Sequence, residues 1–183
     1  MKSIDRLLQR WRIGRARPWL RRGMRVLDIG CADGALFRQC GGLTDGVGID
    51  PDVERGSEVG GNVLVKGLFP DDLPDARPFD AITMLAVLEH IPPGIQPRLA
   101  ADCARHLKPG GHLIITVPAP AVDYVLAGLR AVRLIDGMSL EQHFGFDVGT
   151  TAPTFQGGGL VLVERTWFQL GLNNLFVFQK PAA

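Results

Sequence analysis

The sequence predicts an α/β fold in which a mostly parallel sheet ends in an antiparallel hairpin. Apolar runs of strand length alternate with helical patterns along most of the chain, which is typical of parallel strands joined by helical crossovers. The runs are continuously apolar, as expected of strands covered on both faces. The last two runs are separated only by Gln169–Asn173, which is too short for a crossover, so this pair should be antiparallel.

The individual elements follow from the apolar runs and the helical spacing between them. The expected parallel strands are Met24–Ile29, Gly46–Asp50, Asn62–Lys66, Phe79–Leu85 and Gly111–Val117. The expected helices are Ala35–Cys40, Ile95–Leu107 and a weaker one over Asp52–Glu58, which contains the poor helix former Gly56. The hairpin strands are Leu160–Phe168 and Asn174–Gln179.

Length and composition limit the class of protein. The chain of 183 residues fits one domain. No apolar run reaches the roughly 20 residues that span a bilayer, and the N-terminus lacks the apolar core of a signal peptide. Cys31, Cys40 and Cys103 are an odd number without C-x-x-C spacing. We therefore expect a cytoplasmic protein with reduced thiols.

The N-terminal segment, residues 1–23, is strongly basic. Residues 1–25 hold nine Lys or Arg and one Asp, a net +8, whereas the remainder holds eleven basic and eighteen acidic residues, a net −7. Apolar residues recur in this segment at helical spacing, namely Ile4, Leu7, Leu8 and Trp11. One interpretation is an amphipathic helix that contacts anionic lipid, nucleic acid or a phosphorylated substrate. The other is a helix that packs on the domain of residues 24–183, covers a ligand site and pairs its arginines with acidic groups.

The most informative segment is Val26–Leu36, where an apolar strand ends in a turn of small residues that leads into a helix. Gly30, Ala32 and Gly34 alternate after Asp28, so the backbone can approach a ligand closely. The helix start contributes unpaired N–H groups, and Asp28 contributes a carboxylate. The turn can therefore hold a ligand with an anionic and a cationic end. Its spacing departs from the G-x-G-x-x-G fingerprint of nicotinamide and flavin enzymes.

The segment resembles motif I of the class I S-adenosylmethionine (SAM) methyltransferases, D/E-x-G-x-G-x-G, with Ala32 at the middle glycine. Asp50 follows at the end of the second strand, about 20 residues past the turn, where a carboxylate can accept both ribose hydroxyls of a nucleoside. A helix N-cap is the structural alternative for Asp50. The resemblance implies a Rossmann-like seven-stranded sheet of order 3-2-1-4-5-7-6.

Two later motifs extend the resemblance over residues 24–118. Met84–Ile91 resembles the "vLEHi" motif of the small-molecule branch, near the ubiquinone-pathway O-methyltransferases, and Leu107–Gly111 resembles the "LKPGG" turn of the same branch. Many relatives place an Asp after the third strand to meet the adenine, but here Leu68 or Phe69 holds that place and Asp71 comes later. The resemblance implies a SAM site built from the turn and the neighbouring strand ends: Asp28, Gly30, Cys31, Ala32, Gly34, Asp50, Pro51, Leu68, Phe69 and Leu85.

Methyl transfer to a hydroxyl benefits from a base, and two histidines follow strand ends, where ligands of α/β sheets bind. They are His143 and His90. Each could act as the base, or could instead have a structural or substrate-orienting role. The resemblance also raises the question of a metal site, because some relatives have one with the pattern Glu-x-x-Glu-His. Here only Glu89, His90 and a later His143 would remain, because Ala86 replaces the first Glu. We therefore expect no metal, and Glu89 and His90 to cap the next segment and line the pocket.

The acceptor is expected to be a small molecule. Residues 118–138 are mostly apolar with helical spacing and should flank the acceptor pocket, favouring an aromatic or lipid-like acceptor, or should simply pack on the sheet. The site would be open, or closed by the N-terminal helix or by a second subunit in a homodimer. Alternative functions are a nicotinamide-dependent oxidoreductase, a non-catalytic SAM-binding protein and a nucleic-acid methyltransferase. The acidic body argues against nucleic acid.

Overall fold

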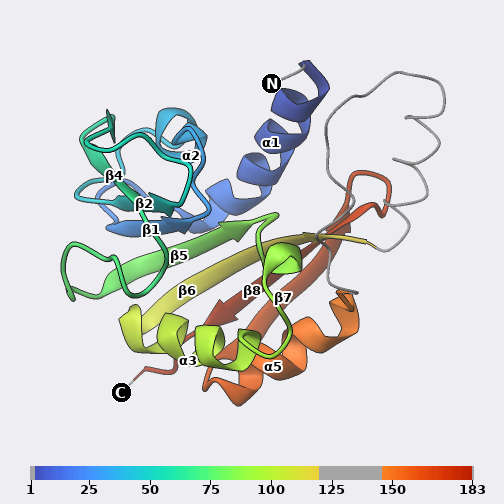
Figure 1. Ribbon diagram of the computed structural model, residues 1–183. Coiled ribbons are helices and arrows are strands. Elements are labelled where there is room, and N and C mark those ends of the chain that lie inside the picture. The colour runs from blue at the N-terminus through green and yellow to red at the C-terminus, as the bar shows by residue number, and fades with distance from the viewer. Residues whose placement is uncertain (1–2, 120–145, 183) are drawn as a thin grey trace.

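A computed structural model shows a single twisted sheet with helices on both faces (Figure 1). It describes residues 3–119 and 146–182, and side chains from residue 6 onward. Within these residues no helix is both long and apolar enough to cross a membrane. Most of the predicted segment 118–138 and the candidate base His143 lie outside the described residues.

The sheet has eight strands in the order β3-β4-β2-β1-β5-β6-β8-β7. The strands are β1 (Val26–Ile29), β2 (Val47–Asp50), β3 (Glu58–Val59), β4 (Asn62–Lys66), β5 (Phe79–Leu85), β6 (Leu107–Pro118), β7 (Val161–Phe168) and β8 (Asn173–Gln179). β1 pairs in parallel with both β2 and β5, and β8 runs antiparallel between β6 and β7. The predicted order is confirmed, with β3 as an additional edge strand.

The helices cover the two faces of the sheet. They are α1 (Ser3–Ala16), α2 (Ala35–Gln39), α3 (Gln96–His106) and α5 (Thr151–Gly157), with 3-10 turns η1 (Arg17–Trp19), η2 (Leu88–His90) and η4 (Val148–Thr150). α1 and α2 lie on one face, and α3 and α5 pack together on the other (Figure 1). Each face has its own apolar core: Phe155 belongs to the core under α3 and α5, and Phe37 to the core under α1 and α2. The centre of the sheet is therefore covered on both faces, which explains the continuously apolar strands.

Two predicted elements differ from the structure. The weak helix over Asp52–Glu58 is a series of turns, because Gly56 adopts φ +78° and Glu58–Val59 pairs with β4 instead. The Leu107–Gly111 turn is part of β6, where it forms an irregularity: Phe79 pairs with Leu107, but Ala81 pairs with His112. A Cβ at Gly111 would lie 2.9 Å from the Lys108 carbonyl oxygen, so the irregularity requires glycine there.

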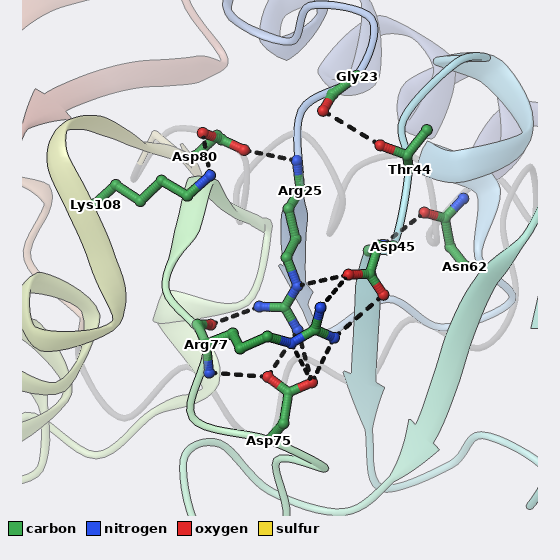
Figure 2. A network of polar contacts seen from close by, with 10 residues as sticks. Gly23, Arg25, Thr44, Asp45, Asn62, Asp75, Arg77, Asp80 and Lys108 are labelled. Carbon is green, nitrogen blue, oxygen red and sulfur yellow. Dashed lines mark hydrogen bonds and ion pairs between the residues drawn. The ribbon is translucent and has the colours of Figure 1, made fainter.

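The amino end of the sheet is held by a network of ionic groups around Arg25 (Figure 2). Arg25 is buried at the start of β1, and its Nη2 lies 3.0 Å from both carboxylate oxygens of Asp75. Its guanidinium also lies 4.1 Å from the Phe79 ring centroid. Asp80 Oδ2 accepts the Arg25 backbone N–H at 2.8 Å, and Asp80 Oδ1 binds Lys108 Nζ at 2.7 Å. The network ties β1, β5, β6 and the loop before β5 together, far from the carboxyl ends of the strands.

Candidate functional site

The turn after β1 adopts a conformation that only small residues permit. Gly30, Ala32 and Gly34 all have positive φ, at +73°, +45° and +73°. A Cβ at Gly30 would lie 2.3 Å from Val87 Cγ2, so any side chain there would clash with the loop after β5. A Cβ at Gly34 would meet Leu64 at 3.1 Å on the far side of the turn. Gly30 therefore keeps the turn close to β5, and Gly34 keeps it close to β4.

A cavity of about 570 Å³ lies at this turn, at the carboxyl ends of β1, β2 and β5. Its volume is within the usual range for small-molecule sites. It is lined by residues of the turn, of the β2 and β5 ends and of α1: Leu8, Gln9, Arg12, Ile13, Asp28, Gly30, Cys31, Ala32, Ala35, Leu36, Asp50, Pro51, Asp52, Leu85, Ala86, Val87 and His90. Ligands of open α/β sheets bind at this position, where the strand order reverses.

Asp28 is the buried carboxylate of the cavity. It lies at the end of β1, and its Oδ1 accepts a hydrogen bond of 2.6 Å from the Thr83 hydroxyl on β5. Burial raises the pKa of Asp28 to about 7, and the Thr83 hydrogen bond works in the opposite direction. The carboxyl group is therefore poised to ionise when a cationic group enters the cavity.

Asp50 organises the turn from the end of β2. Its Oδ2 accepts the Ala32 N–H at 3.0 Å, and its Oδ1 accepts the Asp52 N–H at 2.8 Å. The first bond holds Ala32 in its left-handed conformation, and the second is a local turn bond typical of aspartate. Each carboxylate oxygen can accept a further hydrogen bond, so Asp50 can still receive ligand hydroxyls.

Cys31 and Glu89 are the other buried polar groups around the cavity. Burial raises the pKa of the Cys31 thiol far above its usual value, so the thiol stays protonated and unreactive. Burial also raises the pKa of Glu89 to about 7, although the positive charge of Arg12 partly counteracts it. Glu89 is buried in η2 and does not line the cavity.

Most of the predicted cofactor residues converge on the cavity. Those that line it are Asp28, Gly30, Cys31, Ala32, Asp50, Pro51 and Leu85, together with the candidate base His90. Gly34 packs behind the turn. Leu68 is exposed, and Phe69 contacts the His106 ring at a centroid distance of 5.2 Å, so neither lines the cavity. Among residues 3–119 and 146–182, no group of three or more His, Cys, Asp or Glu is arranged to hold a metal ion.

The sequence left open whether the N-terminal helix covers a ligand site, and it did not identify the α1 residues that line the cavity. Gln9, Arg12 and Ile13 line the cavity, as does Leu8. Of the apolar residues at helical spacing in this segment, Leu8 lines the cavity, whereas Leu7 and Trp11 lie on the exposed face of the helix. Gln9, Ile13 and Ala16 recur at helical spacing. This pattern could have identified the face of α1 that packs on the domain.

Comparisons with known proteins agree with this architecture. A family model described as "Methyltransferase domain" matches residues 2–151. A ubiquinone biosynthesis O-methyltransferase of Xylella fastidiosa (strain 9a5c) is 36% identical in an alignment of 129 residues that covers 62% of this chain and 51% of that protein. The chain thus spans about half the length of the curated relatives that it matches.

Solved structures share the fold at low sequence identity. The N-methyltransferase NodS of Bradyrhizobium japonicum WM9 is 19% identical with a TM-score of 0.68, covering 97% of this chain and 98% of its own. The 1,6-didemethyltoxoflavin-N1-methyltransferase of Burkholderia thailandensis, solved with S-adenosylhomocysteine, is 17% identical with a TM-score of 0.67, covering 95% and 78%. The sheet order, the turn after β1 and the family match lead to one conclusion: the chain belongs to the methyltransferase domain family and has the architecture of the class I SAM-dependent methyltransferases.

Proposed function

We propose that this protein transfers a methyl group from SAM to an oxygen atom of an apolar small molecule. The observation that carries the proposal is the cavity in which the glycine turn, Asp28 and Asp50 meet at the carboxyl ends of β1 and β2. Asp50 would accept the ribose hydroxyls, and Asp28 would face the cationic end of the amino-acid moiety. Arg12 of α1 is a cation in the same cavity and suits a carboxylate.

The acceptor side of the cavity supports a hydroxyl on an apolar molecule. Leu8, Leu85 and Val87 provide apolar walls, and His90 lines the cavity beside them. When bound, SAM supplies a sulfonium that is already an activated methyl donor, so the protein mainly aligns the acceptor. His90 would receive the proton of the acceptor hydroxyl. The name of the Xylella relative, an O-methyltransferase, supports oxygen as the target.

A matched pair of acceptors tests the choice of atom. An alkylated catechol and the corresponding alkylated aniline are incubated with SAM and the protein, and the products are identified by mass spectrometry. We expect methylation of the catechol oxygen. His90→Ala should lower this turnover by about 10²-fold or more, the usual contribution of a general base, and leave S-adenosylhomocysteine affinity unchanged. Methylation of the amine alone would contradict the choice of oxygen, and full activity of His90→Ala would exclude that base.

The raised pKa of Asp28 predicts a pH dependence of ligand binding. Because burial raises this pKa to about 7, the group is mostly protonated at pH 6 and mostly ionised at pH 8. A cationic ligand group binds the ionised form, so affinity for S-adenosylhomocysteine should rise about tenfold from pH 6 to pH 8. Calorimetry at pH 6 in buffers of different ionisation enthalpy should show release of a proton.

Two variants separate Asp28 from the other carboxyl group with a raised pKa. Asp28→Asn should flatten the pH profile of binding more than Glu89→Gln does, because Asp28 lines the cavity whereas Glu89 acts on it only through the charge of Arg12. In the unliganded protein both groups contribute to the pH dependence of stability: a pKa raised in the folded state means that stability falls as the pH rises from about 4 to about 7, and each variant should remove part of this fall. An unchanged pH profile of binding in Asp28→Asn would show that another group is responsible.

A further inference from the structure

The outward face of α1 carries two large apolar side chains that remain half exposed. Leu7 and Trp11 are one helical turn apart and are 50% and 51% exposed. The opposite face of α1 is the one that packs on the domain, where Ile13 and Ala16 are buried. The pair is therefore not needed to attach α1 to the sheet.

The tip of the β7–β8 hairpin lies beside this face and adds a third apolar side chain. Leu170 is 100% exposed. A groove of about 470 Å³ runs between α1 and the tip, lined by Arg10, Trp11, Gly14, Arg15, Phe168, Gln169 and Leu170. Because both elements line one groove, Trp11 and Leu170 belong to one continuous surface.

Arginines surround this apolar surface. Arg6 and Arg10 lie along one edge of the outward helix face, and Arg15 lies along the other, with its guanidinium 5.6 Å from the Phe168 ring centroid. All three are exposed, and none of them forms an ion pair within the described residues. The charge is segregated over the whole chain, with +8 in residues 1–25 and −7 in the rest. The partner of this face should therefore be anionic.

We propose that this surface docks on an anionic lipid bilayer. It consists of Leu7, Trp11 and Leu170 with Arg6, Arg10 and Arg15 around them, and is called here the α1 outer face. Tryptophan and leucine side chains that enter the headgroup region, flanked by arginines that meet lipid phosphates, are the chemistry of interfacial helices.

The composition of the α1 outer face favours lipid over the other partners. Leu7 and Leu170 are aliphatic, so they offer no stacking surface to nucleic-acid bases. A second copy of the chain would bring the same arginines and repel the first. The inward side of α1 lines the cavity with Leu8 and Arg12, so docking would place the cavity beside the membrane. The proposal stands independently of the methyl-transfer reaction, because it rests on exposed residues outside the cavity.

Vesicle flotation with matched charge reversals tests the electrostatic part. The full chain is floated with phosphatidylcholine vesicles that contain or lack phosphatidylglycerol, at low and at high salt. We expect binding only to the anionic vesicles, weakened by salt. Arg10→Glu with Arg15→Glu should lower the partition coefficient about tenfold or more, whereas Arg21→Glu with Arg22→Glu, an equal change of charge in exposed residues off this face, should lower it much less. Equal losses, or equal binding to neutral vesicles, would overturn the proposal.

Tryptophan fluorescence tests the geometry. One variant keeps Trp11 alone (Trp19→Phe with Trp167→Phe), and the other keeps Trp167 alone (Trp11→Phe with Trp19→Phe). Trp167 is also exposed, at 65%, but it lies on the other face of the sheet. Residues two apart in a strand share a face, and Arg165 contacts Phe176 on the side covered by α3 and α5. Anionic vesicles should shift the emission of Trp11 to the blue and leave Trp167 unchanged.

Three results would overturn the proposal. They are a blue shift of Trp167 instead of Trp11, a Trp11 shift caused by a DNA duplex but not by vesicles, and a concentration-dependent Trp11 shift with dimerisation in sedimentation velocity without lipid. Unchanged S-adenosylhomocysteine binding and circular dichroism of every variant would show that the fold and the cavity are intact.

Discussion

Replacing Arg25 with alanine is expected to lower the free energy of unfolding by about 2–5 kcal/mol, because a large buried side chain and its hydrogen bonds are removed. The side chain is buried at the start of β1, bonds both carboxylate oxygens of Asp75 and lies over the Phe79 ring. Its removal leaves a gap above Phe79 and takes the central cation out of the network at the amino end of the sheet. Urea unfolding followed by circular dichroism measures the loss.

Arg77→Ala is the matched control for this network. Arg77 binds Asp45 and Asp75 from the surface, and its hydrogen bonds hold the pKa of both carboxyl groups below the usual value. Its side chain is more than half exposed, so water replaces its contacts and the loss of stability should be much smaller than for Arg25→Ala. Equal losses for the two variants would mean that burial of Arg25 does not determine its contribution.

Replacing Asp50 with alanine is expected to weaken binding of S-adenosylhomocysteine by about 1–3 kcal/mol, which is roughly a 5- to 150-fold rise in Kd. Two hydrogen-bond acceptors for the ribose hydroxyls are lost, and so is the acceptor that holds the Ala32 N–H. Asp33→Ala removes a carboxylate from the same turn that does not line this cavity, and it should leave the affinity unchanged. Isothermal titration calorimetry gives both values.

Asp50→Asn separates the two roles of Asp50. The amide keeps one oxygen that can accept the Ala32 N–H but offers fewer acceptors to a ligand. Affinity between those of the wild type and Asp50→Ala is the expected result. Full affinity in Asp50→Asn would show that this residue only organises the turn and does not bind the ribose.

The sheet order could be predicted because its signals are local and its alternatives few. Continuously apolar runs specify parallel strands between helices, and Gln169–Asn173 is too short to allow anything but an antiparallel hairpin. β3 could not be predicted, because a two-residue strand has no periodicity. α5 was also not predicted, because Thr151–Gly157 contains Pro153 and ends in glycine, and both are poor helix formers.

The candidate site was predictable where it depends on the turn and unpredictable where it depends on distant elements. The turn residues and Asp50 follow strand ends, and parallel strands bring those ends together. The α1 residues Gln9 and Arg12 could not be assigned, because polar residues that line a cavity look like a solvated face. The apolar residues at helical spacing did not define the packing face of α1, because Leu8 lines the cavity whereas Leu7 and Trp11 are half exposed. Leu68 was assigned by analogy alone, and it lies outside the cavity.

The most direct test of the central claim is calorimetric titration of the purified protein with S-adenosylhomocysteine and, separately, with NAD⁺. Both ligands carry adenosine, but the G-x-A-x-G turn and a cavity with Asp28 and Arg12 suit the amino-acid end of the first. We predict binding of S-adenosylhomocysteine with one site per chain and no binding of NAD⁺ at the same concentration. Binding of NAD⁺ in preference to S-adenosylhomocysteine, by a sample with a cooperative unfolding transition, would contradict the assignment of this cavity to SAM.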